Sequence, residues 1–313
     1  MFSYAIAFLV ALTATALLIP PIRRIAADRG LLDQPGGRKV HAQPIPRLGG
    51  VAIGIGFYLA MAVVTLVPLG RPAISMPEMP AILVGGAILA LTGFVDDLRG
   101  LSAVVKLVAQ IAAGVVAFLL GAQVDVLVFP GGPIHLGWLS LPITVAWIVG
   151  VVNAINLIDG LDGLAAGVVL IALVAFFVIA PNDAPLTLIV GAAAGATLGF
   201  LVYNLHPASI IMGDAGSLLL GFLTAVAAIS ISSPGSGFFP PYVPIVVLGL
   251  PLGDMAWTVV RRTLGGKSVF APDAGHVHHR LLNEGLTQRE VVVLLHLVAA
   301  ILAAVGIGLA RLR

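Results

Sequence analysis

Long apolar runs recur along the whole length of this 313-residue chain, and they restrict its fold more than any other feature. Hydrophobic residues make up 59% of the sequence and charged residues only 10%, and the mean hydropathy is +1.11. A run of about 20 apolar residues allows a helix to cross the hydrocarbon core of a bilayer. The alternating pattern of an outer-membrane barrel is absent. The sequence therefore predicts an all-α polytopic membrane protein with one domain over residues 1–313.

About ten transmembrane helices are expected, separated by short polar segments. The first run lacks a basic leader and an obvious cleavage site, so we interpret it as a span and not as a removed signal peptide. The stretch 123–138 differs from the rest, because its alternation around Pro130–Pro133 predicts a small β-hairpin between spans. The expected spans are 2–20, 48–69, 79–95, 102–120, 139–156, 163–180, 185–203, 210–231, 241–260 and 290–310.

The basic residues predict how these spans are oriented. If the N-terminus lies outside, 13 of the 16 Lys and Arg residues fall in inner loops, and only Arg71, Arg311 and Arg313 fall in outer ones. Cytoplasmic loops of membrane proteins carry such an excess of Lys and Arg. This topology places every acidic motif on the cytoplasmic face and the hairpin on the extracytoplasmic side.

The absence of cysteine narrows the chemistry that the chain can perform. With no cysteine, disulfides, thiol catalysis and thiolate metal sites are all excluded. The net charge of +2 says little about partners, because in a membrane protein the distribution of positive charge over the loops matters more.

The first acidic motif is the pair Asp96-Asp97, which follows the apolar run Ala81–Val95. Carboxylates beside hydrocarbon are costly, and adjacent carboxylates repel each other. The pair therefore indicates a bound cation or a proton-transfer task, although a solvated helix end is an open alternative. Lys106 lies inside the next apolar run, where its ammonium either meets a phosphate near the interface or extends toward water.

The second motif carries amide and carboxylate groups between two apolar spans. Asn153, Asn156 and Asp159 are three residues apart, so they share one face while the helix continues. Gly160 then allows a tight turn and the close approach of a ligand to the backbone, with Asp162 two residues further on. A purely structural loop would not need two Asn and two Asp here, so this segment indicates a binding site.

The third motif runs from Met212 to Ser217 and contains Asp214 between two glycines. In such a turn, backbone N–H groups face an anion while the carboxylate holds a hard metal. A plain helix N-cap explains the same string. Asp254, within the apolar run 241–260, is expected to pair with Arg261 or Arg262.

The last inner loop, Pro272–Arg280, contains three histidines and an arginine. Zinc is one possible ligand, but two adjacent histidines do not easily share one metal, and structural zinc sites are closed. A cationic, hydrogen-bonding phosphate clamp fits better, and an incidental polar loop is the third alternative. The basic, proline-rich loop at 38–50 is explained by topology alone.

The chain resembles the polyprenyl-phosphate N-acetylhexosamine-1-phosphate transferases. The motifs that carry this likeness are KVHAQPIPRLGG, FVDDLRGL, NAINLIDGLDGLAAG, YNLHPASIIMGDAGS and PDAGHVHHRLL, and they span nearly the whole chain. The histidine element reads His-x-His-His. It is similar to the branch that starts O-antigen, enterobacterial common antigen or teichoic acid from UDP-N-acetylglucosamine. The branch that uses UDP-N-acetylmuramoyl-pentapeptide typically has three consecutive histidines.

The resemblance implies a reaction at the bacterial inner membrane. A UDP-N-acetylhexosamine gives its sugar-1-phosphate to undecaprenyl phosphate, which forms a lipid-linked diphosphate sugar and UMP. The implied cofactor is Mg²⁺, with Mn²⁺ as an alternative. Asp96 and Asp97 would lie at the reacting phosphate, and Asn156 and Asp214 would hold or adjoin the metal. The residues implied to contact the substrates are Lys39, Lys106, Asp159, Asp162, Asn204, His276, His278, His279 and Arg280.

The residues themselves support the same chemistry. Phosphoryl transfer between two anions requires charge neutralisation and positioning, which a hard cation ringed by Lys, Arg and His supplies. The alternative is a cation- or proton-coupled transporter, which would place ionisable groups near the bilayer midplane, often with repeat symmetry. A purely structural membrane scaffold would not explain why the acidic motifs all lie at span ends on one side of the membrane. The expected partners are the UDP-sugar, undecaprenyl phosphate and the lipid bilayer; no nucleic acid is expected, and a homodimer is compatible with the sequence.

Overall fold

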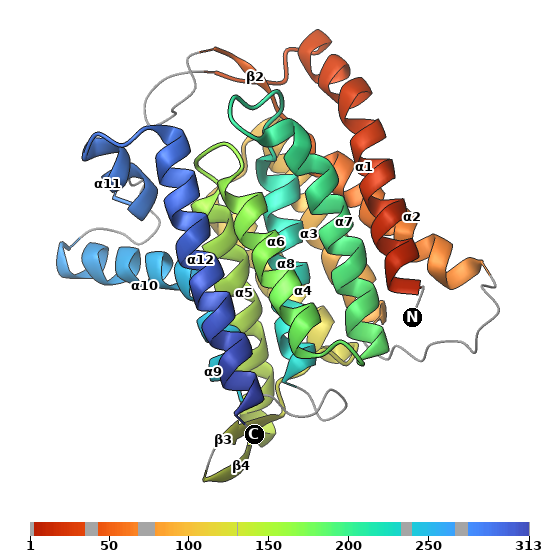
Figure 1. Cartoon of the computed structure of the whole chain (residues 1–313), viewed down its shortest axis with the longest axis vertical. Helices are drawn as coiled ribbons and strands as arrows, with labels where there is room; N and C mark the ends of the chain where they lie inside the picture. The colour runs from red at the N-terminus through yellow and green to blue at the C-terminus, as the bar shows by residue number, and fades with distance from the viewer. Residues whose placement is uncertain are drawn as a thin grey trace.

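A bundle of long helices with nearly parallel axes forms the body of the protein (Figure 1). The computed structural model describes residues 3–34, 43–67, 79–129, 131–232, 240–266 and 275–312. The bundle helices are α1 (Ser3–Asp28), α2 (Gly49–Leu66), α3 (Met79–Arg99), α4 (Ala103–Leu119), α5 (Ser140–Ile158), α6 (Leu164–Ile179), α7 (Ala184–Asn204), α8 (Gly213–Ile231) and α12 (Gln288–Arg311).

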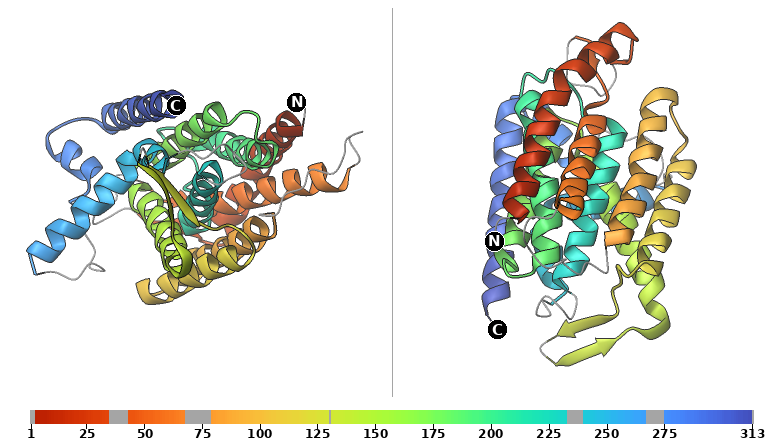
Figure 2. Two further views of the ribbon diagram at one scale, coloured as in Figure 1. Left: turned by 90° about the horizontal axis from the view of Figure 1, so that it is seen from below. Right: turned by 90° about the vertical axis from the view of Figure 1, so that its right-hand side faces the viewer.

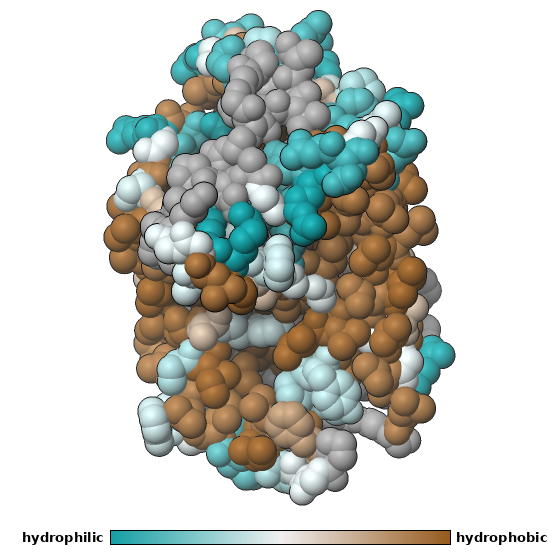
Figure 3. Space-filling view, turned by 90° about the vertical axis from the view of Figure 1, so that its left-hand side faces the viewer, coloured by the Kyte–Doolittle hydropathy of each residue, from teal (hydrophilic) through white to brown (hydrophobic). Residues whose placement is uncertain are grey.

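These helices are those of a polytopic α-helical membrane protein. Among the described residues, seven helices are long and apolar enough to cross a bilayer, and α4 and α6 are shorter apolar helices. Hydrophobic residues dominate the middle of the face shown in Figure 3, and hydrophilic residues gather toward its upper end. Side chains that face lipid must be apolar, which explains this distribution.

Helix α8 lies at the centre of the bundle. Every residue from Ala215 to Ile231 is buried, and the helix packs against α2, α3, α5 and α6, which surround it when the molecule is seen from below (Figure 2). A helix that is apolar all round is buried on all sides. The first turn of α8 is therefore held firmly by its neighbours.

The expected span at 241–260 is broken, which corrects the prediction of one continuous helix there. The chain instead forms α9 (Tyr242–Val247) and α10 (Gly249–Leu264), and α10 projects sideways from the bundle (Figures 1 and 2). Pro251 lacks the N–H that a continuous helix would need at this point. Trp257 and Leu264 are exposed on α10, whereas Asp254 is buried.

Two small antiparallel strand pairs lie at opposite ends of the molecule (Figure 1). One pairs β1 (Leu32–Asp33) with β2 (Ile45–Pro46), and the other pairs β3 (Val126–Phe129) with β4 (Gly132–His135). A 3₁₀ turn at Gly137–Leu139 leads from β4 into α5. The position of β3–β4 outside the cytoplasm stays a prediction.

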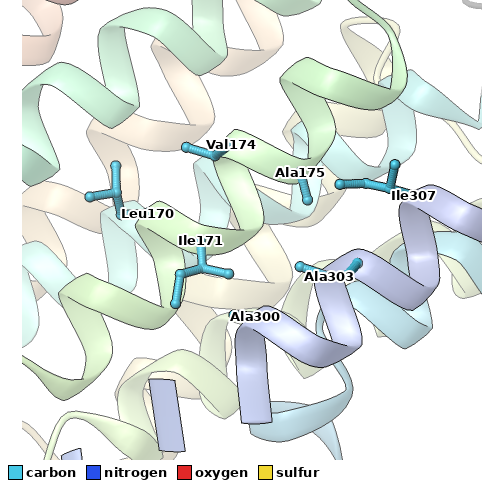
Figure 4. Close-up of a pocket in the computed structure, with 8 residues that line it drawn as sticks. Leu170, Ile171, Val174, Ala175, Ala300, Ala303 and Ile307 are labelled. Carbon is cyan, nitrogen blue, oxygen red and sulfur yellow. The ribbon is translucent and has the colours of Figure 1, made fainter. Parts of the chain in front are cut away.

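Apolar grooves open on the sides of the bundle. One, of about 360 Å³, lies between α6 and α12, and Figure 4 shows only aliphatic side chains along it, among them Ile171 and Ala303. It offers no group for chemistry. Another, which we call the α2–α3 groove, has about 690 Å³ and reaches Ala215, the residue after Asp214.

Candidate active site

The acidic motifs meet at the end of the bundle opposite the β3–β4 hairpin (Figure 1). They lie at the last turn of α3, the first turns of α4 and α8, and the C-terminal end of α5. We call Asp96, Asp97, Lys106, Asn156 and Asp214 the acid half of the site.

Lys106 joins two carboxylates from different helices. Its Nζ lies 2.7 Å from Asp214 Oδ2 and 3.3 Å from Asp96 Oδ2. The second oxygen of Asp96 accepts a hydrogen bond of 2.6 Å from the backbone N–H of Leu101, at the α3–α4 turn. The three charged groups are mostly shielded from solvent, which strengthens the attraction between them.

Asn156 lies beside Asp214, so the structure brings together the two residues predicted at the metal. Its Nδ2 donates to Asp214 Oδ1 at 3.2 Å and to Ser217 Oγ at 2.8 Å. Ser217 lies one turn along α8 and was not predicted as part of the site. Its contact with Asn156 fixes the C-terminal part of α5 against the start of α8.

Asp97 faces α8 and away from Lys106. Its Oδ1 accepts from the Asp214 N–H at 2.9 Å and its Oδ2 accepts from the Ala215 N–H at 3.1 Å. These are N–H groups at the start of a helix, which have no partner within the helix itself. Gly213 has φ +72°, and a Cβ there would lie 2.5 Å from the Asp97 carboxylate. Asp97 thus holds the turn that presents Asp214.

Asp159 follows the last residue of α5, between the acid half and the histidine loop. Burial and, to a smaller extent, the nearby carboxylates of Asp214 and Asp97 together raise its pKa to about 8, against the opposing charge of Arg47. Asp159 is therefore largely protonated at neutral pH while no other cation is near. Arg47 was predicted only as a topology-determining charge, so its influence here was missed.

Asp162 and Asn204 make their described hydrogen bonds to neighbouring segments of the chain. Asp162 Oδ2 lies 2.8 Å from His206 Nδ1 and accepts from the Ala208 N–H at 3.1 Å. Asn204 is buried; its Oδ1 accepts from Gly163 N–H and its Nδ2 donates to the Ile210 carbonyl, both at 2.9 Å. These bonds shape the α5–α6 and α7–α8 turns, and contact of either residue with a nucleotide stays a prediction.

The histidine half of the site consists of Asp254, His276, His278 and His279. Asp254 Oδ2 lies 2.8 Å from His276 Nδ1, and its Oδ1 accepts from the Val277 N–H at 2.8 Å, at the start of α11 (Val277–Asn283). The expected pairing of Asp254 with Arg261 or Arg262 is corrected by these contacts. Because a carboxylate only accepts, the contact with Asp254 favours a proton on Nδ1 of His276.

His278 is the most buried ring of this half, with 1% of its surface exposed. Among the described residues, neither of its ring nitrogens has a hydrogen-bond partner. Burial and the neighbouring histidines lower its pKa to about 4, so the ring is neutral at pH 7. Its ring lies against Gly160, where a Cβ would come within 2.4 Å of Nε2. The histidine loop is thus in contact with the α5–α6 turn.

His279 and Arg280, also predicted at the site, belong to α11. His279 packs on His278 with ring centroids 4.3 Å apart, and Arg280 is exposed. Lys39 lies outside the described residues. A further contact that was missed joins α4 to α5: Asn153 Nδ2 donates to Gln110 Oε1 at 2.6 Å, one turn from Lys106.

Metal binding by side chains alone is not supported within the described residues. No three His, Cys, Asp or Glu side chains there converge as a metal site. Asp214 and Asp96 are the carboxylates that share one cation, and that cation is Lys106.

Fold and site together define a polytopic membrane protein with a polar site at one end of its bundle, and comparison with known proteins identifies the family. The sequence profile described as glycosyl transferase family 4 matches residues 79–232. A probable undecaprenyl-phosphate N-acetylglucosaminyl 1-phosphate transferase of Bacillus subtilis is 39% identical, over 99% of this chain and 86% of its own length.

Two further relatives bear related names. A decaprenyl-phosphate N-acetylglucosaminephosphotransferase of Mycobacterium tuberculosis is 37% identical over 94% of this chain and 80% of its own length. An undecaprenyl-phosphate alpha-N-acetylglucosaminyl 1-phosphate transferase of Escherichia coli is 29% identical over the same shares. The chain belongs to the family of polyprenyl-phosphate N-acetylhexosamine-1-phosphate transferases, as its motifs predicted, and the transporter alternative finds no support.

Proposed function

We propose that this protein transfers N-acetylglucosamine-1-phosphate from UDP-N-acetylglucosamine to a polyprenyl phosphate, undecaprenyl phosphate by expectation. An oxygen of the acceptor phosphate bonds to the phosphorus that carries the sugar, and the bond from that phosphorus to the bridging oxygen breaks, releasing UMP. The observation that carries the proposal is the meeting of Asp96, Lys106, Asn156 and Asp214 from four helices, in a chain whose relatives are named for this transfer.

The acid half suits Mg²⁺ as the cofactor. Its donors are carboxylate and amide groups, the hard ligands that Mg²⁺ prefers, and Lys106 already places one positive charge between them. Mg²⁺ is commonly held by one or two carboxylates and completed by substrate phosphates and water. Asp214, with Asp96 and Asn156, would hold it. When bound, it neutralises charge on the transferring phosphoryl group.

The two adjacent aspartates take different tasks in this proposal. Asp96, whose Oδ2 accepts a hydrogen bond from Lys106, orients the acceptor phosphate and accepts its proton where one is present. Asp97 is a positioning residue, because both of its oxygens hold the backbone of the α8 turn. The adjacent ammonium of Lys106 offsets the repulsion between donor and acceptor phosphates.

The histidine half binds the donor. His276 is oriented by Asp254, and His278 is neutral, with neither ring nitrogen bonded to any described residue, so its N–H can donate to a diphosphate or sugar oxygen. Arg280, exposed at α11, adds positive charge on the same loop. Asp159 and Asp162 lie in the turn that His278 contacts and complete the nucleotide side.

The location follows from the same features. The α2–α3 groove brings apolar, lipid-facing surface to Ala215, beside Asp214, as a lipid acceptor requires. The concentration of Lys and Arg residues in the loops at this end supports a cytoplasmic site in a bacterial inner membrane. The donor then arrives from water and the acceptor from the bilayer.

The experiment is direct. Purified protein in detergent or nanodiscs receives a panel of UDP-sugars with undecaprenyl or decaprenyl phosphate and Mg²⁺, and UMP release is measured. The proposal expects release with UDP-N-acetylglucosamine that depends on the polyprenyl phosphate. Hydrolysis without acceptor, or release with other UDP-sugars only, would contradict it.

A further inference from the structure

The acid half places two carboxylates against one lysine. Lys106 Nζ lies 2.7 Å from Asp214 Oδ2 and 3.3 Å from Asp96 Oδ2, and Asp97 lies behind Asp214. The two carboxylates come from α8 and α3 and the lysine from α4. Carboxylates this close repel unless a cation lies between them. The ammonium of Lys106 is that cation.

The oxygens that hold Lys106 are those best placed to hold a metal. Mg²⁺ binds carboxylate oxygens at about 2.0–2.1 Å, closer than any ammonium contact, so the two cations cannot occupy the same point. Within the described residues, the ammonium bonds only to the Asp96 and Asp214 carboxylates, and no backbone carbonyl anchors it. Its attachment is therefore exchangeable.

The helix that carries Lys106 is anchored separately from its ammonium. One turn further along α4, Gln110 exchanges hydrogen bonds with Asn153 of α5, at 2.6 and 3.4 Å. Gln110 is buried. The Lys106 stem can therefore move without its helix, since four flexible carbons separate the charge from the backbone.

We infer that the Lys106 ammonium and a divalent cation compete for the carboxylate of Asp214. This inference rests on the proposed function, since it assigns the metal to the acid half. Metal arrival releases the ammonium while its stem keeps it beside the site. The freed charge is then available to a substrate phosphate, so the lysine acts only after the metal is in place.

The test measures metal binding without substrates. Mn²⁺ is titrated into purified wild-type protein, Lys106→Met and Lys106→Arg, and free Mn²⁺ is measured by electron paramagnetic resonance. Lys106→Met removes the competitor, so its apparent Kd for Mn²⁺ should fall by about tenfold or more, while its UMP release decreases. Lys106→Arg keeps the charge, so its affinity should stay near that of wild type. Equal or weaker Mn²⁺ binding by Lys106→Met, or no binding by any variant, would overturn the inference.

A second measurement uses the wild-type chain and so does not depend on the folding of a variant. The sequence has three lysines, Lys39, Lys106 and Lys267. Brief acetylation followed by mass spectrometry reports the reactivity of each. Mn²⁺ should raise acetylation of Lys106 relative to the other two, and unchanged or lower reactivity would contradict release. Neither readout involves transfer, so failure of the proposed reaction is seen separately, as absent UMP release by wild type.

Discussion

The two halves of the site are built differently. In the acid half, Asp97 accepts hydrogen bonds from the backbone of α8 with both oxygens, and α8 is buried from Ala215 to Ile231. In the histidine half, the short helix α11 packs against α12, and its first turn is held by the Asp254 carboxylate and by contact of His278 with Gly160. The acid half is therefore anchored to the core of the bundle, which suits a site proposed to hold fixed charges at a reacting phosphate. Among the described residues, both ring nitrogens of His278 lack a hydrogen-bond partner, as the proposed role in binding the donor requires.

The largest effect is expected at Asp214, the carboxylate that the acid half presents. Asp214→Asn keeps the shape and removes the charge, so membrane insertion should survive while UMP release falls at least a hundredfold, as for loss of a metal contact. Asp183→Asn is the matched control, because Asp183 only caps the first turn of α7. Near-normal release by Asp214→Asn at ordinary Mg²⁺ would place the metal elsewhere.

Asp97→Asn separates positioning from chemistry within the acid half. The amide nitrogen cannot accept the second backbone hydrogen bond, so we expect a loss of about 1–3 kcal/mol in stability together with reduced UMP release. Thermal unfolding in detergent measures the first and the transfer assay the second. A variant with wild-type stability but no activity would show that Asp97 acts on the substrate directly.

A smaller effect is expected in the histidine half. Asp254→Asn still accepts from Val277 N–H but no longer selects the Nδ1–H form of His276. The KM for the UDP-sugar should rise roughly tenfold while kcat changes less. Loss of a residue that only orients a binding side chain usually lowers affinity about tenfold or more. Asp125→Asn, far from the site at the hairpin, is the control. A fall in kcat with unchanged KM would show that His276 acts in the chemical step and not in binding the donor.

The smallest effect is a pH dependence at Asp159, which lies between the halves. Its pKa is about 8 in the folded protein, whereas the ordinary value of an aspartate, which applies to the unfolded chain, is about 3.8. The folded state therefore holds the proton more tightly, and stability is lost as pH rises from about 4 toward 8. The thermal midpoint of metal-free protein should fall between pH 6.5 and 8.5, and Asp159→Asn should flatten that fall. An equal fall in both proteins would assign the titration to another group.

Sequence reasoning found the parts of the site because apolar runs and polar motifs are local signals. The acid motifs converge as their positions at span ends predicted, and Asn156 lies beside Asp214. The pairings between helices were missed, among them Asp254 with His276 and Gln110 with Asn153. Such pairs depend on tertiary packing, which spacing does not encode. The break between α9 and α10 had a signal in Pro251, which hydropathy alone conceals.

A direct measurement of metal binding is the closest test of the central claim. That claim is that the acid half holds the metal and the histidine half holds the donor. Mn²⁺ is titrated into wild type, Asp214→Asn and His278→Asn without substrates. The account predicts that Asp214→Asn loses most of its Mn²⁺ affinity while His278→Asn binds as wild type does, with no stoichiometric zinc in the active protein. Loss of binding in His278→Asn with normal binding in Asp214→Asn would contradict it.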